Sequence, residues 1–214
     1  YQTAWLKAHH PHEFFAASMS FDNHQTDKLS IFIDDMRRLG IAVAPPSVND
    51  SEADFSVGQS DEGLTVRYAL GALKGVGEKA MEVLVAERRA KGDFASLDDF
   101  AARIDPKQLN RRQIEALAGA GAFDSVEADR PRAFAGAESL LACANASAHE
   151  RSTGQGGLFG GDVDVAPVLQ LPAAAPWTLA ERMTREKEAF GFYFSAHPVE
   201  QYDAIVAARG ARSY

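Results

Sequence analysis

Apolar residues recur at helical intervals along most of this chain, and this spacing limits the fold more than any other feature of the sequence. Between residues 27 and 39 they follow the i, i+3, i+4, i+7 pattern of an amphipathic helix, and Gly40 stands where such a helix ends. Similar spacing predicts further helices at 1–20 (with Pro11 opening a second helix), 70–74, 78–91, 96–104, 110–118, 131–148 and from Thr178 onward. We therefore expect a mainly α fold.

Two stretches break the helical pattern. Apolar and polar residues alternate at 55–57 and again at 64–68 around Q-S-D-E-G, which predicts one small β-hairpin, preceded by an extended connector at 41–50. Residues 154–161 contain five glycines in eight positions, and residues rich in Ala and Pro continue to Pro176. Such a composition buries too little apolar surface to order itself, so we expect a flexible linker over residues 149–176.

The composition excludes several classes of protein. No apolar run approaches the roughly 20 residues that span a bilayer. Cys143 is the only cysteine, so neither an intrachain disulfide nor a cysteine-rich zinc site is possible. We expect a cytoplasmic protein with no membrane partner. The chain opens without methionine, in a stretch typical of a helix interior, so we also expect a fragment of a longer protein.

The charge of the chain is unevenly distributed. The formal net charge is −8, which counts against a dedicated nucleic-acid-binding protein because such proteins are usually basic. From Lys74 to Glu115, however, nine Lys and Arg residues stand against eight Asp and Glu residues, which gives +1. A phosphate-binding surface is therefore expected only in the middle of the chain.

Gly75-Val76-Gly77 stands just before the helix predicted at 78–91, where free N–H groups favour a phosphate. One alternative is a dinucleotide-binding turn, since G-V-G-E-K-A fits G-x-G-x-x-A. It is disfavoured because a helical turn precedes the glycines and no second strand ending in an acid follows. A P-loop is excluded, because no G-x-x-x-x-G-K-[ST] string occurs.

A helix-hairpin-helix is the alternative that we favour. Val76 would pack inward, the two glycines would let a DNA strand approach, and Lys74 and Lys79 would add charge without selecting sequence. Met81 stands where such motifs usually carry a small residue, so we expect looser helix packing. A weaker second copy is expected at Gly119-Ala120-Gly121, with three cations upstream, although these glycines taken alone favour a helix C-cap followed by a turn. The cations are Lys107, Arg111 and Arg112.

No catalytic or metal-binding constellation is apparent. His9, His10 and His12 have no acidic or thiol partner at metal-ligand spacing. The adjacent carboxylates at 34–35 and 98–99 point apart on a helix, so neither pair makes a metal site. We expect no catalytic residue and no metal site in this chain.

Four blocks together resemble the alpha subunit of bacterial DNA polymerase III. They are Y-Q-T-A-W-L-K-A-H-H-P-H-E-F-F-A-A at 1–17, L-G-A-L-K-G-V-G-E at 70–78, L-N-R-R-Q-I-E-A-L-A-G-A-G-A-F-D at 109–124 and E-K-E-A-F-G-F-Y-F-S-A-H-P at 186–198. The resemblance implies a DNA-directed DNA polymerase, a nucleotidyltransferase that extends a primer with deoxynucleoside triphosphates and magnesium. The catalytic aspartates of that family lie upstream of these blocks.

The resemblance also implies a division of the chain. The end of the fingers region would occupy 1–45, a connector with the hairpin 46–69, and the tandem helix-hairpin-helix region 70–130. A helix would follow at 131–148, then the linker at 149–176 and a helical lead-in to an oligonucleotide-binding domain at 177–214.

Residues 155–159, Q-G-G-L-F, resemble the short segment with which this family docks on the beta sliding clamp. The implied contacts are Gln155, Gly156, Gly157, Leu158 and Phe159. The implied partners are double-stranded primer-template DNA, the clamp and other subunits of the polymerase III holoenzyme. The alternative function is a stand-alone helix-hairpin-helix protein or scaffold of DNA repair.

Overall fold

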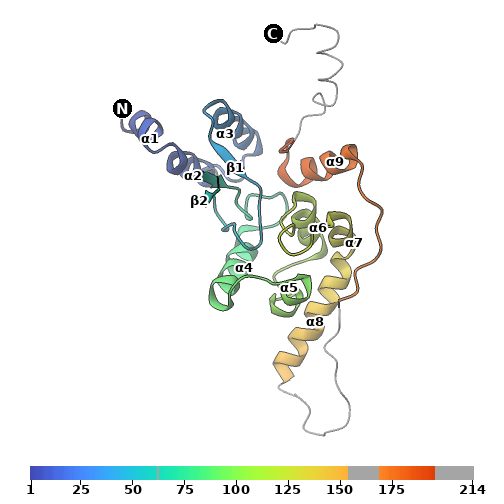
Figure 1. Cartoon of the computed structure of the whole chain (residues 1–214). Coiled ribbons are helices and arrows are strands. Elements are labelled where there is room, and N and C mark those ends of the chain that lie inside the picture. Colours follow the sequence, from blue (N-terminus) through green and yellow to red (C-terminus); the bar gives the residue numbers. More distant parts are fainter. Residues whose placement is uncertain (62, 154–168, 196–214) are drawn as a thin grey trace, which may run out of the picture.

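The computed structural model describes residues 1–61, 63–153 and 169–195. Over these ranges the chain forms nine helices and three short strands (Figure 1), so the predicted mainly α fold is confirmed. In chain order they are α1 (Gln2–His9), α2 (Pro11–Phe21), α3 (Thr26–Arg38), β1 (Ala42–Ala44), β2 (Ser56–Ser60), β3 (Gly63–Arg67), α4 (Glu78–Lys91), α5 (Leu97–Arg103), α6 (Arg111–Ala120), α7 (Arg130–Ala135), α8 (Ala137–Thr153) and α9 (Leu179–Phe190). Among the helices in these ranges, none is long and apolar enough to cross a membrane.

The N-terminal helices follow the predicted pattern. α1 ends at His9, and Pro11 is the first residue of α2, because proline needs no N–H partner at that position. α3 ends at the predicted place, where Gly40 takes a positive φ of 71°. The buried residues of α2 and α3 include Phe15, Met19, Leu29, Ile33 and Met36, which recur at helical spacing, whereas Leu39 at the end of the pattern is 53% exposed.

The three strands form one small mixed sheet. β2 and β3 pair antiparallel, with Val57 opposite Val66, so the predicted hairpin is confirmed. β1 pairs parallel with the other edge of β3, which makes a strand of part of the predicted connector. Tyr68 follows β3 and is fully buried, its ring 4.9 Å from that of Phe55 and 4.8 Å from that of Phe190 in α9.

Two of the predicted helices differ in the structure. Residues 70–74 form turns rather than a helix, since so short a segment closes too few backbone hydrogen bonds to sustain one. The helix predicted at 131–148 is divided at Gly136 into α7 and α8. Leu171 packs so closely there that a Cβ on Gly136 would lie 2.4 Å from its side chain. Local spacing cannot reveal a contact with a residue so distant in sequence.

α9 brings the C-terminal part of the described chain back onto the core, where it packs against α6 (Figure 1). Thr178 and Glu181 form a capping box at its start. Glu186 is 2% exposed and accepts hydrogen bonds from Arg130, Arg182 and Ser195. The buried core therefore runs without interruption from α2 to α9.

Candidate nucleic-acid interface

The turn between the sheet and α4 has the shape of a hairpin built around Val76. Gly75 and Gly77 both have positive φ, 75° and 84°, a region that side chains with a Cβ avoid. Val76 is fully buried between them, as predicted, while both glycines are exposed. The backbone of this turn therefore meets solvent on the side away from Val76.

The N–H groups of the hairpin divide into two sets. Two are used inside the molecule: Val76 N donates to Leu73 O, and Lys74 N donates to Ala189 O at the end of α9. The structure describes no partner for the N–H groups of Gly75, Gly77, Glu78 and Lys79. The last three open α4, where the helix dipole adds partial positive charge. The hairpin can therefore offer several donors to one anion.

A second helix start lies beside this hairpin. α5 and α6 are joined by a turn at 104–110, and Asn110 and Gln113 form a capping box at the start of α6. The Gln113 amide also donates to the carbonyl oxygen of Val76, which ties α6 to the hairpin. The turn at 104–110 is therefore the second helix–turn–helix unit. The sequence predicted both helices of this unit but not its place beside the first hairpin, although the N-cap and N3 residues of N-R-R-Q carry the capping-box signal.

Gly119 and Gly121 have a different setting from Gly75 and Gly77. Gly119 is buried within α6, where an added Cβ would lie 3.5 Å from the backbone of Arg185 in α9. Gly121 is the left-handed C-cap of α6, and its N–H donates to Ala118 O. These glycines end a helix and allow close packing, and no helix opens after them before α7. We therefore leave them out of the interface proposed below.

The predicted cations are not equivalent. Lys79, Lys107 and Arg112 are exposed, and the structure describes no ion pair for them. Arg111 instead pairs with Glu115 at 2.7 Å and Glu138 at 3.3 Å. These contacts raise the pKa of the Arg111 guanidinium, chiefly through the hydrogen bond to Glu115.

The end of the Lys74 side chain lies at the C-terminus of α9, since a Cβ on Gly191 would come within 2.7 Å of its Nζ. A helix C-terminus favours a cation. The positive charge of Lys74 therefore interacts favourably with the C-terminus of α9 and also lies beside the hairpin.

A hollow of about 550 Å³ joins the two units. Its lining comes from the hairpin, the start of α6 and α9, and includes Lys74, Gly75, Asn110, Arg112, Arg185 and Glu188. Arg185 pairs with Glu188 at 3.0 Å, so α9 contributes little net charge to this hollow. Glu115 also lines the hollow but pairs with Arg111 at 2.7 Å, so the uncompensated positive charge comes from Lys74 and Arg112.

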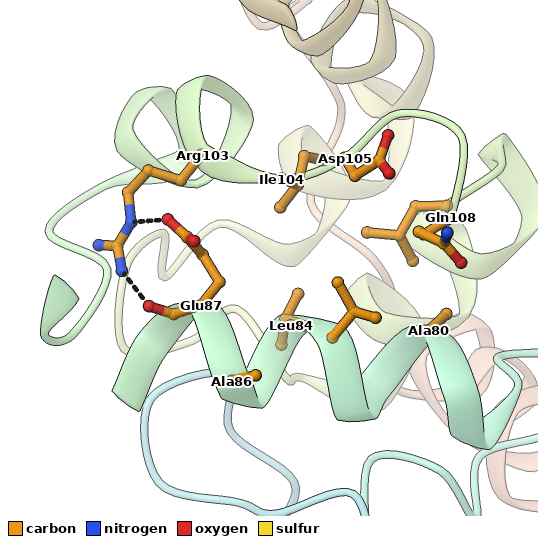
Figure 2. Close-up of a pocket in the computed structure, with 10 residues that line it drawn as sticks. Ala80, Leu84, Ala86, Glu87, Arg103, Ile104, Asp105 and Gln108 are labelled. Carbon is orange, nitrogen blue, oxygen red and sulfur yellow. Dashed lines mark hydrogen bonds and ion pairs between the residues drawn. The ribbon is translucent and has the colours of Figure 1, made fainter. Parts of the chain in front are cut away.

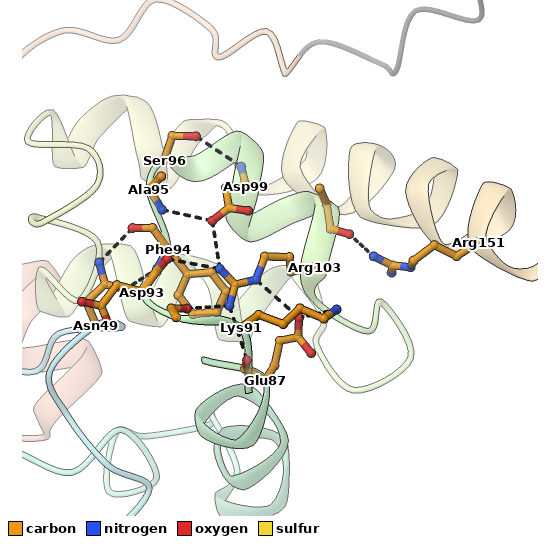
Figure 3. A network of polar contacts seen from close by, with 12 residues as sticks. Asn49, Glu87, Lys91, Asp93, Phe94, Ala95, Ser96, Asp99, Arg103 and Arg151 are labelled. Carbon is orange, nitrogen blue, oxygen red and sulfur yellow. Dashed lines mark hydrogen bonds and ion pairs between the residues drawn. The ribbon is translucent and has the colours of Figure 1, made fainter. Parts of the chain in front are cut away.

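Arg103 fixes the turn at 104–110 to the end of α4 (Figure 3). Its guanidinium donates to the Glu87 and Asp99 carboxylates and to the carbonyls of Asp93 and Gly92, and lies 4.3 Å from the centroid of the Phe94 ring. Burial raises the pKa of Glu87, but hydrogen bonds and charge from Lys91 and Arg103 outweigh this effect and hold that pKa below its usual range. The network positions the second turn.

A groove of about 340 Å³ lies between α4 and the same turn (Figure 2). Apolar side chains line it, including Leu84 of α4 and Ile104 of the turn, and the Glu87–Arg103 ion pair lies at one end. In the described part of the chain, no group of three His, Cys, Asp or Glu side chains is placed to hold a metal ion.

Two further predictions concern the packing at Met81 and the clamp-docking segment. Met81 is fully buried, and the close approach in this region occurs instead at Gly71, where a Cβ would lie 3.2 Å from the Cα of Glu78. The predicted clamp-docking residues, Gln155 to Phe159, lie outside the described residues.

Comparisons with known proteins converge on one family. The helix-hairpin-helix motif family matches residues 40–133, a range that contains both hairpin turns. The chain is 47% identical over 209 residues to the DNA polymerase III subunit alpha of Caulobacter vibrioides, covering 98% of this chain and 18% of the relative. The same subunit of Neisseria meningitidis serogroup B is 43% identical (94% and 17% covered), and that of Thermus aquaticus 41% (96% and 16%). The chain thus spans less than a fifth of the length of these curated relatives.

Proposed function

Because this chain is homologous to a segment of the DNA polymerase III alpha subunit that contains a helix-hairpin-helix region, we propose that it holds duplex DNA for a DNA-directed DNA polymerase. The observation that carries this proposal is the set of unpartnered N–H groups at Gly75, Gly77, Glu78 and Lys79. A phosphate placed there accepts several hydrogen bonds at once and lies on the positive end of α4.

In this proposal the turn at 104–110 binds the other strand of the DNA duplex. Lys107 and Arg112 flank the start of α6, and the Gln113 hydrogen bond fixes that start relative to the first hairpin. Contacts of this kind read the phosphate backbone and not the bases, so binding is independent of sequence, as primer extension requires. The Glu78 carboxylate at the first turn of α4 repels a phosphate bound there, so we expect the affinity of this site to be moderate.

Catalysis belongs to other parts of the parent protein in this proposal. Magnesium and the primer terminus would be held by carboxylates elsewhere in the parent protein. The segment at 155–159 would tether the chain to the beta sliding clamp, with Leu158 and Phe159 entering an apolar pocket and Gln155 fixing the register. Other holoenzyme subunits would be further partners. The homology over 94–98% of this chain favours the polymerase over a stand-alone repair protein.

The test is the salt dependence of primer-template binding, measured by fluorescence anisotropy. Replacing Lys74 and Lys79 by Ala removes two cations beside the hairpin, and we expect weaker binding with a salt slope reduced by about one to two. Arg38→Ala is the matched control, because Arg38 is exposed on α3 and the structure describes no ion pair for it. An unchanged slope in the double variant would show that the hairpin is only structural.

A further inference from the structure

A second hollow lies beside the Gly75-Val76-Gly77 hairpin. It has a volume of about 450 Å³ and separates the hairpin from the turn that joins α2 to α3. Asn23, His24 and Thr26 line it from that turn, and Lys74, Gly75 and Gly77 line it from the hairpin. The turn between α2 and α3 belongs to the N-terminal helices and carries none of the residues assigned above to DNA.

Two helix starts face this hollow. α4 begins directly after Gly77, and α3 begins at Thr26, whose N-cap Gln25 makes no side-chain capping bond. The Gln25 amide instead donates to Asp22. The structure describes no partner for the N–H groups of Thr26, Asp27 and Lys28. Both helices are long, with 13 and 14 residues, so their dipoles add in the same space.

Asn23 is the observation that points to a ligand. It is 6% exposed, it lines the hollow, and the structure describes no hydrogen bond for its side-chain amide. Neither amide atom is among the fully enclosed unpaired atoms of the described residues, so the amide is buried yet still open to solvent. An amide without a protein partner can donate a hydrogen bond to a ligand that enters the hollow.

Among the residues that line the hollow, Lys74 is positively and Glu78 negatively charged, so N–H donors and not net charge would hold an anion there. The end of the Lys74 side chain lies close to Thr26, because a Cβ on Gly191 would contact both. The neighbouring carboxylate of Asp22 is already engaged by Lys28 at 2.8 Å and by Gln25 at 2.7 Å. Glu78 is the carboxylate that lines the hollow itself, and the exposed His24 lines it as well.

We propose that this hollow is a second phosphate subsite, in which the Asn23 amide and the start of α3 bind a phosphodiester next to the one held by the hairpin. The inference rests on the proposed function, because it assigns the occupant to the same DNA strand. It gives the N-terminal helices a direct part in holding DNA. Asn23 acts as a neutral donor, so it adds a contact at one phosphate without adding to the overall attraction for polyanions.

The experiment removes one phosphate charge at a time. The whole chain is titrated with primer-template duplexes in which single phosphates are replaced by neutral methylphosphonates, and the scan is repeated with Asn23→Ala. We expect the wild-type protein to lose affinity about tenfold at two neighbouring phosphates, the effect of one charge-assisted hydrogen bond each. Asn23→Ala should lose only one of these two sensitivities, and Asn145→Ala, an exposed asparagine on α8, should keep both.

The outcomes separate this inference from the function on which it rests. Sensitivity at a single phosphate in the wild-type protein, unchanged in Asn23→Ala, would overturn the second subsite while leaving the hairpin in place. No binding of duplex at all would overturn the proposed function first. Free inorganic phosphate, followed by phosphorus NMR, distinguishes the other source of the same chemistry. Asn23-dependent binding of free phosphate without any change in duplex affinity would overturn the assignment to DNA.

Discussion

Replacing Gln113 by Ala tests the connection between the two helix–turn–helix units. Gln113 is 9% exposed, donates to the Val76 carbonyl and accepts from the Asn110 N–H. The Ala variant leaves a buried carbonyl without a donor, at a cost of about 1–3 kcal/mol, and removes half of the capping box. We expect the free energy of unfolding to fall by about 2–3 kcal/mol.

Urea denaturation with linear extrapolation measures this change, and Gln108→Ala is the control. Gln108 is exposed in the same region, and the structure describes no side-chain hydrogen bond for it. We also expect duplex affinity to fall about tenfold in Gln113→Ala, because the start of α6 is no longer fixed beside the hairpin. A loss of stability in Gln113→Ala no larger than in the Gln108 control would refute the claim that this side chain joins the units.

Three further predictions follow from other contacts. Gly77→Ala, at a φ of 84°, should destabilise the chain by about 1 kcal/mol and weaken duplex binding more than Gly119→Ala does, as compared by thermal unfolding and anisotropy. Arg103→Ala should raise the pKa of Glu87, as measured by an NMR titration. Because that pKa is depressed in the folded wild type, the stability that Glu87 contributes is present above its unfolded pKa and is lost as pH falls through its folded pKa. The free energy of unfolding of the variant should therefore fall less on acidification than that of the wild type. A peptide of residues 152–162 should displace a known ligand from the sliding clamp, and no displacement at high micromolar peptide would contradict the assignment of Gln155 to Phe159.

The local sequence predicts most of the fold, because most of the decisive signals are local. Spacing located α3, Pro11 divided α1 from α2, and alternation located β2 and β3. The local pattern fails to predict the structure where a contact with a residue distant in the sequence determines it. Leu171 packs against Gly136 at the break between α7 and α8, and β1 is a strand only because β3 lies beside it.

The candidate site was predicted only in part, because some of its residues meet through contacts between segments that are distant in the sequence. The glycines with positive φ and the buried Val76 follow from G-V-G and a following amphipathic helix. The repeated Gly-x-Gly predicted a second copy at Gly119–Gly121, whereas Asn110 and Gln113 place a helix start beside the first hairpin. Asn23 gave no signal in the sequence, since its significance depends on the hollow that α3 and the hairpin form together.

The most direct test of the account follows the backbone amides of an isotopically labelled chain by NMR as primer-template duplex is added. We predict the largest chemical-shift changes at Gly75, Gly77, Glu78 and Lys79, whose N–H groups have no described partner in the molecule. Val76 and Lys74, whose N–H groups are already bonded, should change less. Duplex binding that leaves the first four amides unchanged and shifts residues elsewhere would contradict the central claim.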